Sequence, residues 1–274
     1  MREHTHKLFI YTALPCEAKP LVEHFKLKKD LTVQTFAVYV SRDICLTVTG
    51  LGKSAMAAGV AYTQALFAVE APFFMLNLGV AGHQDAALGS LFLMDKITDA
   101  ESLRSYYPSM VFSLPYARGE LKTVSRPQLR YESATFFDME ASAFYETAVR
   151  FISSEFVFCL KVVSDNQHSS VENIQAPQVS KWIAEHVGDI ESLLAKVTAY
   201  RVQEGQESDA LLFDTLIQRY HFTVNERRQL KNHLEHWAVV TDHQPLELDE
   251  SVLTSAKEVL NWLASKNQGV AFNL

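Results

Sequence analysis

Hydrophobic and polar positions follow two different periods along the first 200 residues. Short apolar runs rich in β-branched and aromatic residues predict strands, and apolar positions at helical spacing lie between them. The predicted strands are Lys7–Leu14, Thr32–Val40, Asp43–Thr49, Pro72–Gly79, Gly89–Asp99, Glu120–Ser125, Ala134–Met139 and Glu155–Asp165. The predicted helices run from Lys53 to about Glu70, from Glu140 onward, and over Ala176–Val197. The second and third strands, joined by Ser41 and Arg42, predict a hairpin.

This alternation predicts an α/β domain of three layers, α/β/α, with a central mixed sheet. The continuous apolar run Pro72–Gly79 (PFFMLNLG) is typical of a strand that helices cover on both faces. The alanines of the helix that begins at Lys53 permit close packing on such a sheet. We therefore expect one large domain over residues 1–198.

The pattern changes after residue 198. Thr198–Ser208 (TAYRVQEGQES) is polar and predicts a linker. Three amphipathic helical patterns follow, over Asp209–Tyr220, Asn225–Val240 and Asp249–Ala264. Thr223 precedes Glu226 by three residues, as in a capping box, and Asp249 has the right chemistry for an N-cap. Residues 199–274 are thus predicted to form a small all-helical C-terminal extension.

Composition narrows the class of protein. The chain has 274 residues, of which 48% are hydrophobic and 21% charged, and its formal net charge is −7. This acidic balance argues against a nucleic-acid partner. No apolar run reaches the roughly 20 residues needed to cross a membrane, and Met1–Leu14 lacks the features of a signal peptide. Three scattered cysteines, Cys16, Cys45 and Cys159, suit reduced thiols and predict a cytoplasmic protein.

Acids and glycines gather where predicted strands end. The stretches are ALPCEAKP (Ala13–Pro20), TGLGK (Thr49–Lys53), NLGVAG (Asn77–Gly82), MEAS (Met139–Ser142) and VSDN (Val163–Asn166). Strand ends at one edge of an open α/β sheet form a single crevice for ligands, and glycine allows close backbone approach. Taken singly, Glu17, Asp138, Glu140 and Asp165 are equally consistent with acids that cap helices.

The order and wording of these stretches resemble the nucleoside phosphorylase and nucleosidase superfamily. They are most similar to the branch that contains 5′-methylthioadenosine/S-adenosylhomocysteine nucleosidase. ALPCE is similar to the family's A-M-x-x-E, TGLGK to S/T-G-I/L-G-K, and NLGVAG to N-x-G-x-A-G. FFDMEASA is similar to V-x-M-E-x-x-A, and VVSDN to the S-D segment. The resemblance covers roughly residues 7–195 and leaves out the C-terminal extension.

The resemblance implies cleavage of the N-glycosidic bond of a nucleoside, with no cofactor and no metal. Glu140 would accept hydrogen bonds from ribose hydroxyls, and Met139 would pack its thioether against the sugar. Asp165 would donate a proton to N7 of a purine, and Glu17 would activate water for attack on C1′. Asp138 would support the turn. The remaining substrate-binding residues that the resemblance implies are Gly79, Val80, Ala81, Gly82 and Ser164.

Two departures from the family concern the substrate. Val80 stands where the nucleosidases carry a small hydroxyl residue, and the stretch from Asp99 to Phe136 is shorter than theirs. Pro127 and Gln128 are the counterparts of the family's base pocket. No aromatic residue for stacking lies among them, although Tyr131 is close in sequence. Resemblance also implies a homodimer.

The nucleophile is left open between water and phosphate. Phosphorylases of this superfamily hold phosphate with arginine, and Arg104, Arg118, Arg126 and Arg130 lie in the shortened stretch. Glu17 favours water, because a carboxylate repels an incoming phosphate dianion. The hypothesis is hydrolysis of a purine nucleoside, with 5′-methylthioadenosine or S-adenosylhomocysteine as candidates. A nucleoside phosphorylase is one alternative, and a catalytically weak nucleoside-binding protein is the other.

Overall fold

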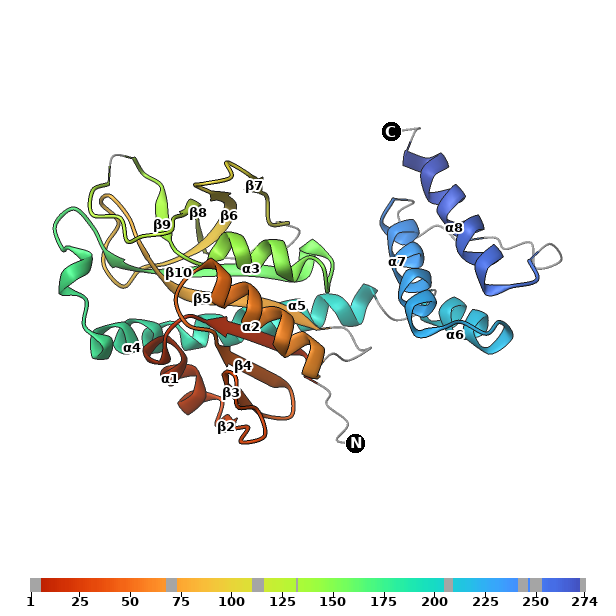
Figure 1. Cartoon of the computed structure of the whole chain (residues 1–274), viewed down its shortest axis with the longest axis horizontal. Coiled ribbons are helices and arrows are strands. Elements are labelled where there is room, and N and C mark those ends of the chain that lie inside the picture. Colours follow the sequence, from red (N-terminus) through yellow and green to blue (C-terminus); the bar gives the residue numbers. More distant parts are fainter. Residues whose placement is uncertain are drawn as a thin grey trace. The chain divides into compact units, whose positions relative to one another are not determined.

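The structure is a computed structural model of the whole chain (Figure 1). It describes residues 6–67, 73–109, 116–131, 133–204, 209–240, 246 and 253–271. The chain divides into two compact units, Met1–Val197 and Thr198–Leu274. Each unit has its own buried apolar cluster, so each is described by itself.

The first unit is built on one mixed sheet of ten strands. The strands are β1 (Leu8–Thr12), β2 (Lys28–Lys29), β3 (Ala37–Val40), β4 (Ile44–Val48), β5 (Phe74–Gly82), β6 (Leu91–Asp99), β7 (Ser105–Tyr106), β8 (Ala117–Thr123), β9 (Phe136–Asp138) and β10 (Val157–Asp165). Their order is β10-β6-β8-β9-β5-β1-β4-β3-β2, and β10 also pairs with β5. Five strands therefore close on themselves, and β1, β4, β3 and β2 extend the sheet from β5.

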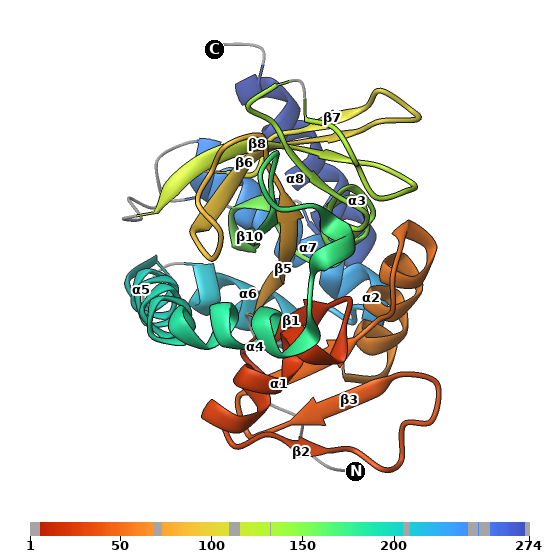
Figure 2. The same ribbon diagram turned by 90° about the vertical axis from the view of Figure 1, so that its left-hand side faces the viewer.

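Helices cover both faces of this sheet, as the alternating pattern predicted. They are α1 (Pro15–His24), α2 (Lys53–Phe67), α3 (Ala141–Ala148), α4 (Ala176–Glu185) and α5 (Val187–Glu204). Figure 2 shows α2 and α3 on one side of the sheet, and α1, α4 and α5 on the other. The predicted fold class, α/β with a central mixed sheet and C-terminal helices, is confirmed.

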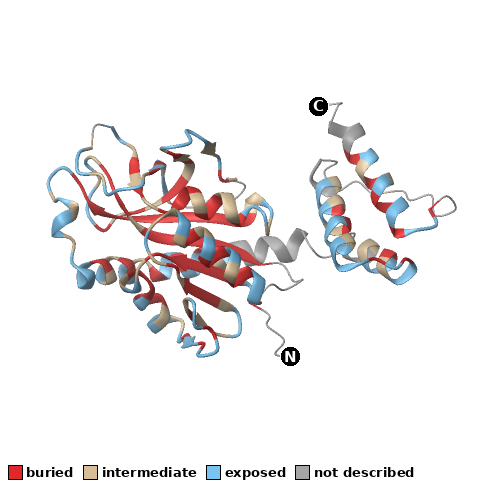
Figure 3. Ribbon diagram, viewed as in Figure 1, coloured by how far each residue is buried: buried red, intermediate tan, exposed pale blue. Residues whose placement is uncertain are grey.

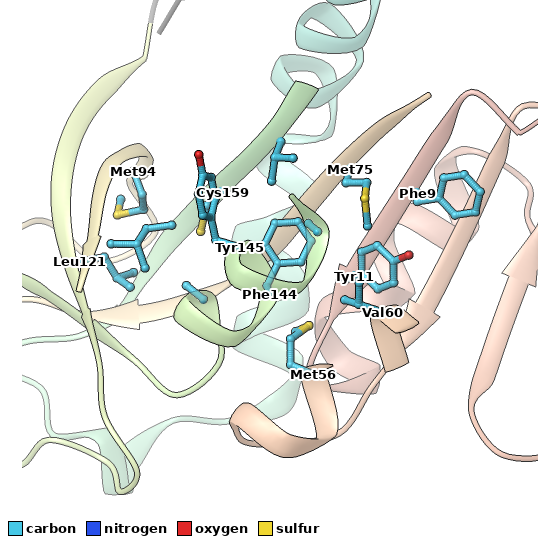
Figure 4. Close-up of a cluster of buried hydrophobic side chains, with 14 of the residues drawn as sticks. Phe9, Tyr11, Met56, Val60, Met75, Met94, Leu121, Phe144, Tyr145 and Cys159 are labelled. Atoms are coloured by element: carbon cyan, nitrogen blue, oxygen red, sulfur yellow. The ribbon is translucent and has the colours of Figure 1, made fainter. Parts of the chain in front are cut away.

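The central strands are buried along their whole length (Figure 3). β10 is buried at all nine positions and β5 at eight of nine, because layers of helices cover both faces. Figure 4 shows the apolar cluster that joins α2 and α3 to the sheet, with Met56 and Val60 from α2 beside Tyr11 and Phe144. This packing fixes the strand ends that carry the acids.

Three predicted boundaries were wrong. β5 does not end at Gly79 but continues through Gly82, because its backbone pairs with β10 up to Asp165. The predicted helix Ala176–Val197 is two helices that meet at His186. The predicted linker is also wrong, since α5 continues to Glu204 and residues 205–208 lie outside the described ones. The stretch from Thr198 to Glu204 contains good helix formers and no glycine or proline.

The second unit contains α6 (Asp209–Arg219), α7 (Val224–Val240) and α8 (Ala256–Ala271). The predicted capping box is present, since Glu226 accepts from the backbone of Thr223 at 2.8 Å and donates its own N–H to Thr223 Oγ1 at 3.3 Å. The third helix begins at Ala256 and not near Asp249, which lies outside the described residues. No helix in the described part of the chain is long and apolar enough to span a membrane.

Candidate functional site

The predicted acids meet along the second half of β5. Gly79 pairs with Lys161 of β10, and Gly82 pairs with Asp165 of β10 and Phe137 of β9. β9 runs antiparallel to β5, so Asp138 and the residues after it return alongside this half of the strand. The expectation that all of these stretches follow strand ends at one edge is wrong for Met139–Ser142, because this stretch follows β9, which runs antiparallel to β5.

Glu17 reaches β5 from the first turn of α1. Its Oε2 accepts backbone hydrogen bonds from Ala13 and Leu14, both at 2.8 Å, and its Oε1 accepts one from Val80 at 3.0 Å. The carboxylate thus serves the start of α1, as the capping alternative predicted, and also ties α1 to β5. Burial raises the pKa of Glu17 above its ordinary value, against the opposing effects of these backbone donors and of Lys161.

Gly79 makes room for this approach. A Cβ at residue 79 would lie 3.0 Å from Glu17 Oε1 and 3.4 Å from Lys161 Nζ. A side chain here would press on the Glu17 carboxylate and leave Lys161 in ordinary contact. The glycine is therefore needed because two ionisable side chains come close to its backbone.

Lys161 is a buried cation that the sequence analysis missed. Only 1% of the residue is exposed, and its Nζ lies 2.9 Å from Asp138 Oδ2. Burial alone would lower the pKa of Lys161, but the charges of Asp138 and Glu140 outweigh it and raise the pKa. The signal in the sequence was a single lysine inside the apolar run FVFCLKVV. A strand covered on both faces keeps such a lysine away from solvent, so it needs a charged partner.

Asp138 and Glu140 divide the two roles that the sequence left open. Asp138 accepts from Thr123 Oγ1 at 2.7 Å and from the backbone of Ala141 at 2.8 Å, so it supports the start of α3. Glu140 occupies the N-cap position of α3, yet its side chain makes no capping hydrogen bond. Its Oε1 instead accepts from the backbone of Gly52 at 2.7 Å, which joins α3 to the loop before α2.

The surroundings of Glu140 favour its protonated form more than solvent water would. Burial, together with the charge of Asp138, raises its pKa to about 7, although Lys161 and the Gly52 N–H act in the opposite direction. Three carboxyl groups (Glu17, Asp138 and Glu140) thus surround one ammonium group. Such a cluster has an excess of negative charge when all three are ionised, and it favours cationic or hydrogen-bond-donating ligands.

A cavity of about 220 Å³ lies next to Glu140. Its lining residues are Leu51, Gly52, Lys53, Ser54, Ser125 and Met139. Lys53 is held by Asp99 Oδ2 at 2.8 Å and by Glu101. Met139, predicted to face a sugar, therefore faces open space at the start of α2, beside the carboxylate predicted to bind the sugar hydroxyls.

Asp165, the last residue of β10, marks a second part of the site. It is buried, its Oδ1 accepts from Ser164 Oγ at 2.6 Å, and its Oδ2 accepts from the hydroxyl of Tyr131. The bond that an Asp165 cap would make belongs to Asn166, whose Oδ1 accepts from the backbone of His168 and Ser169 at 2.9 and 3.1 Å. The capping interpretation of Asp165 is therefore wrong for its side chain.

β5 connects the two parts of the site. Gly79 lies beside Glu17 and Lys161, and Gly82 lies beside Asp165 and Tyr131. A Cβ at Gly82 would lie 2.6 Å from Asp165 Oδ2 and would overlap the Tyr131 hydroxyl. Between them, Val80 donates its N–H to Glu17 and Ala81 is buried in the core. The register of β10 shifts between Val163 and Asp165, and such an irregularity re-aims the end of a strand.

The remaining predicted residues lie outside β5 and β10, at exposed or half-buried positions. Pro127 is exposed and Gln128 half-buried, on the loop between β8 and β9. That loop places Tyr131, not Pro127 or Gln128, against Asp165. The predicted phosphate-binding candidates Arg104, Arg118, Arg126 and Arg130 are all exposed, and Arg104 pairs with Glu146 at 3.0 Å. Among the described residues, no three His, Cys, Asp or Glu side chains are arranged so that they could hold a metal ion.

Solved structures of nucleosidases share this architecture. A 5′-methylthioadenosine/S-adenosylhomocysteine nucleosidase from Helicobacter pylori, in complex with butyl-thio-DADMe-Immucillin-A, matches with a TM-score of 0.58 at 14% identity, over 71% of this chain and 100% of that chain. A futalosine hydrolase mutant from the same organism matches with a TM-score of 0.54 at 14% identity, over 70% and 99%. The corresponding nucleosidase from Colwellia psychrerythraea, in complex with adenine, matches with 0.53 at 16%, over 68% and 96%.

The chain has the fold of these nucleosidases. No protein-family model and no curated protein matches its sequence. The resemblance drawn from the motifs is thus confirmed at the level of the fold alone. At identities this low, activity and substrate have to be argued from the chemistry of the site.

Proposed function

We propose that this protein hydrolyses the N-glycosidic bond of a purine nucleoside, with 5′-methylthioadenosine and S-adenosylhomocysteine as the first candidates. The proposal is carried by one observation, on the carboxyl groups of Glu140 and Asp165. Both carboxyl groups are buried, and neither makes the helix-capping bond that would explain an acid at its position. Buried acids that helix capping does not account for are candidates for chemistry.

Glu140 would bind the sugar. Its carboxylate adjoins a cavity that Met139 and the start of α2 line. An ionised carboxylate accepts strong hydrogen bonds from the two neighbouring hydroxyls of a ribose. The excess of carboxyl groups over Lys161 would also stabilise the positive charge that develops on the ribosyl ring as the bond to the base breaks.

Asp165 would protonate the leaving base. In its protonated form it donates a hydrogen bond, and then the proton, to N7 of the purine, while the electron pair of the C1′–N9 bond goes to the base. The bond from Ser164 Oγ to Oδ1 fixes the orientation of the carboxyl group, so that Oδ2 is the oxygen that faces the ligand. The free base would leave with this proton.

Glu17 would take a proton from the attacking water. Its raised pKa makes it a better proton acceptor than an ordinary glutamate, and Val80 holds Oε1 beside β5. Water then supplies the oxygen that bonds to C1′, so that nucleoside and water give the free sugar, with its 5′ substituent, and the free base. Val80 carries no hydroxyl, so its side chain would make no hydrogen bond to the water, and Glu17 would orient it.

The experiment is an assay of base release from a panel of nucleosides: 5′-methylthioadenosine, S-adenosylhomocysteine, adenosine, inosine and uridine, each with and without phosphate. Wild type, Glu17→Gln and Asp165→Asn are compared. We expect release without phosphate, lowered about 10²–10⁴-fold in each variant. The matched control is Glu120→Gln, an exposed acid paired with Lys96 at 2.9 Å, which should leave the rate unchanged.

Two outcomes would contradict hydrolysis. Release only in the presence of phosphate would indicate a phosphorylase, and Arg118, Arg126 and Arg130 would then be replaced in turn. No release from any nucleoside, with measurable nucleoside binding, would indicate a binding protein on the same fold. Full activity in Asp165→Asn would remove Asp165 from the reaction.

A further inference from the structure

Tyr131 occupies the position in front of Asp165. Its hydroxyl donates to Asp165 Oδ2 and is 3.2 Å from the backbone oxygen of Gln128. Its ring contacts that of Phe137, with 5.7 Å between centroids. Gly82 admits the side chain, because a Cβ at residue 82 would overlap the hydroxyl. The aromatic ring therefore lies directly over the end of β5.

Because Tyr131 fills the space in front of Asp165, the two ends of the site differ in the room they leave for a ligand. At the Glu140 end there is a cavity of about 220 Å³, and neither Asp165 nor Tyr131 lines it. At the Asp165 end, the oxygen that would meet a ligand already has a hydrogen-bond partner from the chain itself. Pockets for whole small molecules are usually about 300–1,000 Å³, so a nucleoside needs more room than the open end provides.

We propose that Tyr131 is a gate: its phenol fills the place of the base, and a purine reaches Asp165 only when Tyr131 leaves. This proposal rests on the proposed function, since it takes Asp165 as the group that meets the base. The ligand and the phenol compete for the same oxygen, Oδ2. Binding of the base therefore costs the hydrogen bond between Tyr131 and Asp165.

The segment that carries Tyr131 is suited to such movement. It follows β8, and its neighbours Leu129 and Arg130 are exposed, with Leu129 at 67%. In the part of the chain that the structure describes, the Gln128 side chain bonds within the segment, to the backbone oxygen of Arg130 at 2.6 Å. Among the described residues, the side-chain anchors of Tyr131 to the rest of the unit are the bond to Asp165 and the contact with Phe137, and so few anchors permit local opening.

The first test is the binding of free adenine to the full chain, measured by calorimetry. Tyr131→Phe keeps the ring but loses the competing hydroxyl, so adenine should bind on the order of tenfold more tightly than to wild type, the equivalent of about one net hydrogen bond. The control is Tyr116→Phe, which removes a hydroxyl bonded elsewhere, to the backbone oxygen of Asp189, and should leave the affinity unchanged. Equal or weaker binding to Tyr131→Phe would overturn the gate.

The second test needs no ligand. Trypsin cuts after the exposed Arg130, and cleavage of a segment follows the population of its open form. Tyr131→Phe should be cut several-fold faster at this bond than wild type or Tyr116→Phe, because its anchor to Asp165 is gone. Adenine should speed the cut in wild type, whereas protection by adenine would mean that the segment closes over the base and would overturn the proposal.

The two tests separate failure of the gate from failure of the proposed function. Faster cleavage in Tyr131→Phe without adenine binding to any variant would retain the anchor and reject adenine as the base. Unchanged cleavage in Tyr131→Phe would overturn the gate, whatever the nucleosidase assay shows.

Discussion

At the scale of single residues, acids with the same pattern in the sequence have different duties. Asp138 and Glu140 are two residues apart, yet Asp138 supports the start of α3 and pairs with Lys161, while Glu140 bonds to the loop before α2. Glu17 caps α1 and also contacts β5. Only the bonds each carboxyl group makes distinguish a structural acid from one left available for a ligand.

Glu140 should make stability depend on pH. Its pKa of about 7 in the folded protein lies above the value near 4.3 of an unfolded chain, so the folded state holds the proton between these two pH values. The free energy of unfolding should therefore fall as pH rises through this window, by up to about 4 kcal/mol from this group. Hydrogen exchange of β10 amides in urea would measure it.

Glu140→Gln should remove that part of the pH dependence, because glutamine does not titrate. Glu120→Gln, which replaces an exposed acid, should keep the wild-type slope. If wild type and Glu140→Gln show the same slope between pH 5 and 7, the raised pKa of Glu140 would be contradicted. Glu17, whose pKa is also raised, should contribute a slope of the same sign in every variant.

At the scale of elements, the break between α4 and α5 illustrates how one loop position controls a helix boundary. The residue between them, His186, places its Nε2 2.7 Å from the backbone oxygen of Gly89. Gly89 has a φ of +80° and packs under Trp182 of α4. The loop before β6 thereby fixes where α4 ends, and the helical pattern of Ala176–Val197 contains no sign of it.

Gly89→Ala should destabilise the first unit by about 2–4 kcal/mol. A Cβ there would lie 2.6 Å from Trp182 Cδ1, and alanine disfavours the positive φ, so strain and overpacking add. Gly188→Ala is the matched control, since nothing lies within 4 Å of its added Cβ and it is in α5, where alanine is the better helix former. Thermal unfolding followed by Trp182 fluorescence would compare them. A decrease in melting temperature no larger than that caused by Gly188→Ala would contradict this account of the loop.

At the scale of the whole molecule, the described residues include two separate apolar clusters, one in each unit. One joins the sheet to its helices, and the other is formed by α6, α7 and α8 with Leu216, Leu230, Leu234 and Val259 among its members. Each core can order its own unit. We therefore expect the units to respond separately to substitutions in their cores.

Leu230→Ala should lower the stability of the second unit by about 2–5 kcal/mol, as large-to-small changes at fully buried leucines do. Hydrogen exchange should show faster exchange in α6–α8 and unchanged protection in β5 and β10. Phe144→Ala, at an equally buried position of the first unit, should do the reverse. Loss of protection in both units from either substitution would show that they unfold as one.

The sequence by itself determined the type and order of most elements, because apolar periodicity records which faces are buried. It also identified Glu17, Glu140 and Asp165 as acids near strand ends; their catalytic and binding roles stay predictions. The tertiary structure decided what pattern alone does not contain. It paired Lys161 with Asp138, returned β9 antiparallel to β5, and put Tyr131 in front of Asp165. These contacts join residues 23 to 55 positions apart in the chain. They depend on how strands pair and where loops pack, which no local pattern specifies.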